Sequence, residues 1–131
     1  MQLYLDTSAL VKLIVIERET SALRTYLREC ADDVRFTAAL TRTELLRAVR
    51  RSGSFELAGH AHRVLGRLDV VALTNRLLDE AGSVGPPELR TLDAIHLAAA
   101  RTAPALRGLV TYDLRLAAAA GAVGVSVASP R

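Results

Sequence analysis

Four acidic residues stand at positions that favour chemistry over simple solvation. Asp6 and Asp113 each directly follow a short apolar segment typical of a β-strand. Glu44 and Asp93 each lie in the first turn of a segment with helical periodicity. Because the carboxyl ends of parallel strands share one edge of a sheet, we expect the four side chains to meet there. A pocket of carboxylates is typical of a Mg²⁺ or Mn²⁺ site rather than a zinc site, which uses His and Cys.

Each acid also has a simpler structural explanation. Glu44 follows Thr41 by three residues, which matches a capping box at the start of a helix. Asp6, Asp93 and Asp113 each lie near a helix N-terminus, where a carboxylate is favoured. For any one of these acids, the capping role explains its position as well as a metal role does. The four acids together favour a shared pocket. In such a pocket, mutual repulsion is expected to raise the carboxylate pKa values above those of the unfolded chain.

The elements that must position these acids alternate between strand and helix. Strands are expected over residues 2–5, 34–37, 70–73, 108–111 and 123–127. Segments with helical periodicity, expected over residues 20–29, 41–51, 55–68, 74–84, 91–102 and 114–120, lie between them, and a first helix follows Asp6. This alternation predicts a parallel sheet with helices on both faces. At 131 residues without a repeat or linker, the chain is expected to form a single domain over residues 1–131.

Composition limits the class of protein. Cys30 is the only cysteine, so an internal disulfide and a cysteine zinc site are excluded. The apolar run at residues 10–16 contains Lys12 and is too short to span a bilayer, so a cytoplasmic protein without membrane association is expected. The net charge of +3 comes almost entirely from arginine, which suits contacts to phosphate groups.

Four short segments carry a resemblance to a known family. They are DTSALVK at residues 6–12, TRTELLRAV at 41–49, LDAIHLAAA at 92–100 and VTYDLRLAAAA at 110–120. Their order and spacing resemble PIN-domain ribonucleases, especially the VapC toxins of bacterial toxin–antitoxin pairs. The resemblance implies a PIN-like three-layer sandwich, in which helices cover both faces of a five-stranded parallel sheet. It also implies Mg²⁺- or Mn²⁺-dependent endoribonuclease activity, a homodimer, and a small VapB-like antitoxin partner.

The resemblance extends to individual residues. The acidic quartet of the family falls on Asp6, Glu44, Asp93 and Asp113, with Asp6 and Asp93 as the first choices for direct metal ligands. No member of the quartet is missing.

Several further residues border the expected pocket. Hydroxyl groups at the positions of Ser8 and Thr111 bind metal-bound water or orient an acid in the family. Arg42 and Arg47 lie on the same helix as Glu44 and are expected to contact RNA phosphates. The remaining candidate, His96, is expected to be a packed or surface histidine rather than a metal ligand.

Two other functions remain open from the sequence. A haloacid-dehalogenase-like phosphatase would use Asp6 as nucleophile, but it would need a second Asp where this chain has Ser8. A non-catalytic PIN-like binding module would act only through its antitoxin complex. The intact quartet argues against this second alternative.

Overall fold

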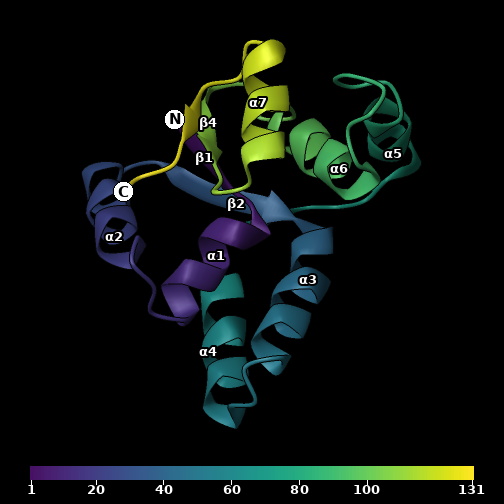
Figure 1. The fold of residues 1–131 in the computed structure, drawn as a ribbon. Helices are drawn as coiled ribbons and strands as arrows, with labels where there is room; N and C mark the ends of the chain where they lie inside the picture. Colours follow the sequence, from purple (N-terminus) through teal and green to yellow (C-terminus); the bar gives the residue numbers. More distant parts are fainter.

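The computed structural model describes residues 1–131, and its five strands form one parallel sheet (Figure 1). The strands are β1 (Gln2–Leu5), β2 (Val34–Ala38), β3 (Asp69–Val71), β4 (Leu106–Val110) and β5 (Val127–Ala128). Their order in the sheet is β3-β2-β1-β4-β5. The chain therefore adds β2 and β3 on one side of the central strand β1, and then β4 and β5 on the other side. The reversal occurs between β1 and β4, and the carboxyl end of such a switch point is where α/β sheets bind ligands.

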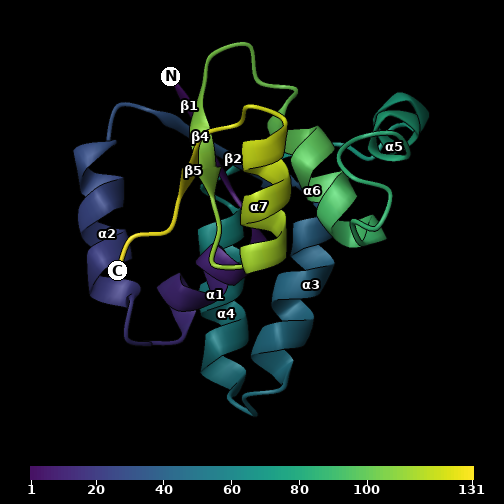
Figure 2. The same cartoon turned by 45° about the horizontal axis from the view of Figure 1, so that its top comes forward.

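Helices cover the two faces of the sheet (Figure 2). One face packs against α1 (Thr7–Ile14), α2 (Thr20–Glu29), α3 (Ala39–Arg50) and α4 (Phe55–Leu65). The other face packs against α5 (Asn75–Ala81), α6 (Thr91–Ala100) and α7 (Leu114–Ala122). The predicted three-layer sandwich is therefore confirmed. None of these helices has the length and apolar character needed to cross a membrane.

Side-chain alternation along β1 divides the core into two aliphatic clusters. Leu3 and Leu5 belong to the cluster beneath α1–α4, whereas Tyr4 belongs to the cluster beneath α5–α7. This follows from the two-residue period of a strand, which sends successive side chains to opposite faces. All residues of α6 from Asp93 to Ala100 are buried, because small alanine side chains let this helix lie close to the sheet. Asp93 is thereby brought into the interior at the start of the helix.

The last strand is shorter and later than the sequence predicts. α7 continues to Ala122, and the chain then turns at Gly124, whose positive φ of 79° suits glycine alone. The Val125 N–H returns to the Ala120 carbonyl at 2.9 Å, which keeps this segment in the helix cap. Pairing with β4 therefore begins only at Val127.

Candidate active site

Asp6 and Asp113 lie at the carboxyl ends of neighbouring strands. Asp6 follows β1 and Asp113 lies three residues beyond β4, and Leu5 pairs with Val110 between these strands. Each aspartate is also the N-cap of the next helix: Asp6 Oδ1 accepts from the Ala9 N–H at 3.0 Å. Asp113 Oδ1 accepts from two backbone N–H groups in the same way, at 2.9 and 3.2 Å. The capping role and a site role are therefore compatible, since a cap uses only one oxygen of each carboxylate.

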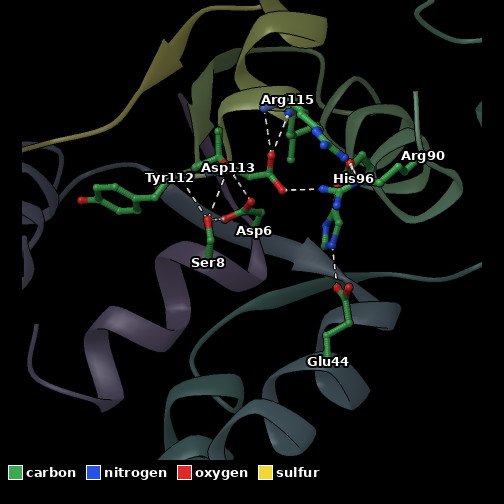
Figure 3. A network of polar contacts seen from close by, with 11 residues as sticks. Asp6, Ser8, Glu44, Arg90, His96, Tyr112, Asp113 and Arg115 are labelled. Atoms are coloured by element: carbon green, nitrogen blue, oxygen red, sulfur yellow. Dashed lines mark hydrogen bonds and ion pairs between the residues drawn. The ribbon is translucent and has the colours of Figure 1, made fainter. Parts of the chain in front are cut away.

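Hydroxyl groups orient the buried Asp6 carboxylate (Figure 3). Ser8 Oγ donates to Asp6 Oδ1 at 2.7 Å, and Thr111 Oγ1 donates to Asp6 Oδ2 at 2.5 Å. Burial raises the pKa of Asp6 above its usual value, and these hydrogen bonds act against the rise without cancelling it. Both hydroxyls thus contact Asp6 itself. Ser8 also accepts the Tyr112 N–H at 2.9 Å, so it fills the place where a phosphatase of the kind considered above would carry a second carboxylate.

Glu44 does not form the predicted capping box. α3 begins at Ala39, two residues before the predicted start, so Glu44 lies in the second turn. The Thr41 hydroxyl pairs with that of Thr37 at 2.7 Å and does not cap the helix. The capping-box interpretation was wrong because β2 runs directly into the helix and displaces its first turn.

The actual partners of Glu44 come from two other helices. Thr7 Oγ1 donates to Glu44 Oε1 at 2.7 Å, and His96 Nε2 lies 2.6 Å from the same oxygen. Burial acts to raise the pKa of Glu44, but the hydrogen bonds from His96 and Thr7 outweigh it, so the pKa is lowered. This direction is opposite to the one expected from repulsion among four acids, because Glu44 has partners of its own.

His96 connects Glu44 to the core. It is only 3% exposed, and its Nδ1 lies 2.6 Å from the Tyr4 hydroxyl. Burial raises the pKa of Tyr4, so the hydroxyl keeps its proton beside Nδ1. Nε2–H is the donor to Glu44, because the lowered pKa keeps this carboxylate ionised and an ionised carboxylate can only accept. The sequence predicted a packed or surface histidine, and the structure places it in the buried position. The contact with Glu44 was missed, because its only signal was a polar residue on an otherwise apolar helix.

Asp93 finds its partner in a residue that the sequence reasoning missed. Arg90 Nε donates to Asp93 Oδ2 at 2.8 Å. The same guanidinium donates through Nη2 to Asp113 Oδ2 at 2.8 Å (Figure 3). The spacing of three residues between Arg90 and Asp93 was the available signal, because such pairs contact each other at a helix start. The bridge to Asp113, 23 residues away, has no local signal.

The four acids border one cavity of about 550 Å³ at the carboxyl edge of the sheet. Its lining also includes Ser8, His96, Arg47 and Arg51. The structure therefore brings together the predicted quartet, Ser8 and Arg47, with Thr111 buried behind Asp6. Arg42 is exposed on α3 and lies outside this lining.

The donor atoms in the cavity suit a hard divalent cation. All four candidate ligands are carboxylates, whereas zinc sites draw on His and Cys. In this arrangement no three Asp, Glu, His or Cys side chains are close enough to form a closed ligand set. Mg²⁺ does not require one, because it typically binds one or two carboxylates and keeps several of its waters. The acids therefore fit an open, partly hydrated metal site.

Comparison with known sequences gives full-length matches. The PIN domain family model matches residues 3–122. Ribonuclease VapC46 of Mycobacterium tuberculosis (strain ATCC 25618 / H37Rv) is 48% identical over 130 residues, which cover 98% of this chain and 97% of the relative. Ribonuclease VapC47 of Mycobacterium tuberculosis (strain CDC 1551 / Oshkosh) is 43% identical over 131 residues, with coverage of 98% and 96%.

Solved structures share the fold at much lower identity. VapC20 of Mycobacterium tuberculosis, described as a toxin that cleaves the sarcin-ricin loop, has a TM-score of 0.76 at 18% identity. That match covers 98% of this chain and 100% of VapC20. A toxin–antitoxin complex from Klebsiella pneumoniae contains a chain with a TM-score of 0.72 at 17% identity, with coverage of 100% and 98%. These similarities support the three-layer architecture.

Proposed function

Because the chain belongs to the PIN-domain family and to its VapC ribonucleases, we propose that residues 1–131 form a single PIN-like endoribonuclease domain. Ribonucleases of this family depend on divalent metal ions. We propose Mg²⁺ or Mn²⁺ for this chain and a toxin role in a VapBC-type pair, acting in the cytoplasm. The observation that supports this function best is the meeting of four carboxylates, from four segments of the chain, around one cavity.

The four acids have different tasks in this proposal. When bound, a divalent ion lowers the pKa of a coordinated water and neutralises charge on the leaving oxygen of a phosphodiester. Asp6 and Asp93 are the proposed direct ligands. Glu44 and Asp113 would contact the metal ion through waters, complete a site for a second ion, or assist the deprotonation of a water. Glu44 is suited to the last task because its lowered pKa keeps it ionised and able to accept a proton at neutral pH.

Arginines on α3 and at its C-cap provide the proposed contacts to RNA phosphates. Arg47 and Arg51 line the acid cavity, and together with Arg50 they line a second cavity of about 490 Å³. None of the three forms an ion pair with an acid of this chain, so their charges are available to a polyanion. Arg42 lies outside both linings and would contact a phosphate farther from the cleavage point.

Cleavage of RNA with and without EDTA tests this function. We expect cleavage in Mg²⁺ or Mn²⁺, none in EDTA, and no hydrolysis of a phosphate monoester. Monoester hydrolysis would favour the phosphatase alternative, and no reaction of either kind would favour the binding module.

The arginine contacts have a separate readout in RNA binding. Arg47→Ala should lower the slope of log affinity against log salt by about 1, because one phosphate contact is lost. Arg42→Ala removes the same charge from the same helix and should change the slope less.

The proposed protein partner is a small VapB-like antitoxin. We propose that it lays a segment across the groove near the quartet and places a basic side chain among the acids, where it competes with metal. In solution the chain is proposed to form a homodimer. Inhibition of cleavage by the carboxy-terminal fragment of the antitoxin tests the interface. Tight binding by the remainder of the antitoxin, and none by this fragment, would place the interface elsewhere.

A further inference from the structure

A cation of the chain itself lies between two acids of the proposed metal site. The Arg90 guanidinium donates to Asp93 at the start of α6 and to Asp113 at the start of α7, at 2.8 Å in both cases (Figure 3). Arginine keeps its charge at neutral pH. The bridge is therefore a permanent positive charge at the position where two carboxylates from different elements approach each other.

The oxygen that Arg90 holds on Asp113 is the one that a metal ion would need. Asp113 Oδ1 already accepts the backbone N–H groups of Arg115 and Leu116 as the cap of α7. Oδ2 is left for a cation, and Arg90 Nη2 occupies it. A divalent ion bound to the same oxygen would stand a few ångströms from the guanidinium and be repelled by it. The two cations therefore compete for one atom.

Arg90 is free to leave this position. It precedes α6 in an extended conformation, and its side chain is 54% exposed. A guanidinium with this exposure keeps much of its hydration, so its ion pairs contribute little net stability. Asp6 and Glu44 differ, because their side chains contact hydroxyls, a backbone N–H and an imidazole instead of an arginine. Within the quartet, only Asp93 and Asp113 are thus paired with an arginine of this chain.

We propose that Arg90 is a metal-competing positioning residue: its guanidinium occupies the cation position between Asp93 and Asp113 in the metal-free protein, and a divalent ion binds by displacing it. This inference rests on the proposed function in the form in which Asp93 is a direct metal ligand and Asp113 completes a second ion site. Its consequence is a lower metal affinity than the carboxylates alone would give. A second consequence is that removal of metal returns Arg90 to the acids and does not leave them unpaired.

Titration of the full chain with Mn²⁺ by calorimetry tests the competition. The variants are Arg90→Ala and a matched control, Arg115→Ala, which removes an exposed charge beside the same Asp113. The Arg115 side chain makes no ion pair, and its backbone cap contact survives the substitution. We expect Arg90→Ala to bind Mn²⁺ about fivefold more tightly than wild type, the lower end of ordinary coupling between two sites, because the exposed ion pairs of Arg90 are weak. The control should stay within about twofold, because exposed charges are screened by salt.

Two further measurements guard against a folding defect in Arg90→Ala. Arg90→Lys keeps the positive charge but replaces the planar guanidinium, which contacts both aspartates, by a single ammonium group. Its Mn²⁺ affinity should therefore lie between those of wild type and Arg90→Ala. In the wild type, NMR of the Arg90 Nε–H, assigned by its loss in Arg90→Lys, should report release directly. We expect this signal to shift and to exchange faster with solvent when Mg²⁺ is added.

The outcomes separate this inference from the function on which it rests. Normal Mn²⁺ binding by wild type with equal or weaker binding by Arg90→Ala would overturn the competition and make Arg90 a scaffold for the acids. An Arg90 Nε–H signal that is unchanged at saturating Mg²⁺ would also overturn it. If neither wild type nor any variant binds Mn²⁺, the metal site itself is wrong, and the proposed function and this inference fall together.

Discussion

Two buried aspartates at opposite ends of the sheet are held in opposite ways. At the amino end, Asp33 contacts the guanidinium of Arg107 and the amino group of Met1, the latter at 3.3 Å. Arg107 and this amino group lower the pKa of Asp33 to about 2. At the carboxyl end, Asp6 contacts only hydroxyls and a backbone N–H, and burial raises its pKa.

The difference separates an acid with a structural role from the acid that we propose binds a metal ion. The charge of Asp33 is neutralised by Arg107 and the amino group of Met1. An additional cation would therefore gain little by binding this carboxylate. Asp6 is oriented by its neighbours but not neutralised, so the binding of an external cation would relieve its unfavourable burial. The following tests compare the two ends of the sheet, beginning with the largest expected effect.

The first test compares Asp6→Asn with Asp33→Asn in RNA cleavage. Loss of a direct metal ligand should lower the cleavage rate at least about 100-fold, more than the loss of a residue that only supports a ligand. Asp33→Asn should cleave at nearly the wild-type rate but melt at a lower temperature, because Arg107 loses its partner. Equal cleavage by wild type and Asp6→Asn would remove the proposed role of the carboxyl end.

The second test concerns the side chains that hold Glu44 at the carboxyl end. His96→Gln should lower cleavage by about 10- to 100-fold, since residues that orient a metal-site acid contribute on this scale. Tyr4→Phe should have a smaller effect in the same direction, because His96 stays in place but loses a hydrogen bond worth about 1 kcal/mol. His62→Gln, on the exposed side of α4, is the matched control. Unchanged cleavage by His96→Gln would show that Glu44 needs no alignment.

The third test measures thermal melting with and without Mn²⁺. A ligand that binds only the folded state at 100 times its Kd stabilises it by about 2.7 kcal/mol, so wild type should melt higher in Mn²⁺ than in EDTA. Asp33→Asn should keep this response, whereas Asp6→Asn should lose most of it. A similar loss in both variants would contradict the distinction between the two ends.

The smallest expected effect is in the pH dependence of the metal-free protein. The folded pKa of Asp33, about 2, lies below the unfolded value of about 3.9, so its stabilisation is present above pH 4 and lost as the pH falls toward 2. The stability difference between wild type and Asp33→Asn should therefore shrink over that interval. Asp6 has the opposite sign: its raised pKa favours the folded state at low pH, and that advantage disappears as the pH rises through the pKa. Denaturant unfolding in EDTA at several pH values measures both trends.

Local sequence determined the framework of this protein and the edge at which its acids would lie. Alternating apolar segments predicted the parallel sheet, and β1 and α2 begin and end where the periodicity indicated. Asp6 and Asp113 were expected at one edge because the carboxyl ends of parallel strands must lie together there. Their functional roles stay predictions, but their shared position follows from the alternation alone.

The tertiary structure alone decided how each acid is held. Glu44 is paired with His96, 52 residues away, and Asp113 with Arg90, and neither contact has a local sequence pattern. Such partners depend on how α3, α6 and α7 sit against the sheet, and hence on the summed packing of many side chains. Capping and helical spacing describe only neighbours within a few residues. They therefore suggested a capping box for Glu44 that the structure does not contain, and they gave no sign that Arg90 would bridge two acids.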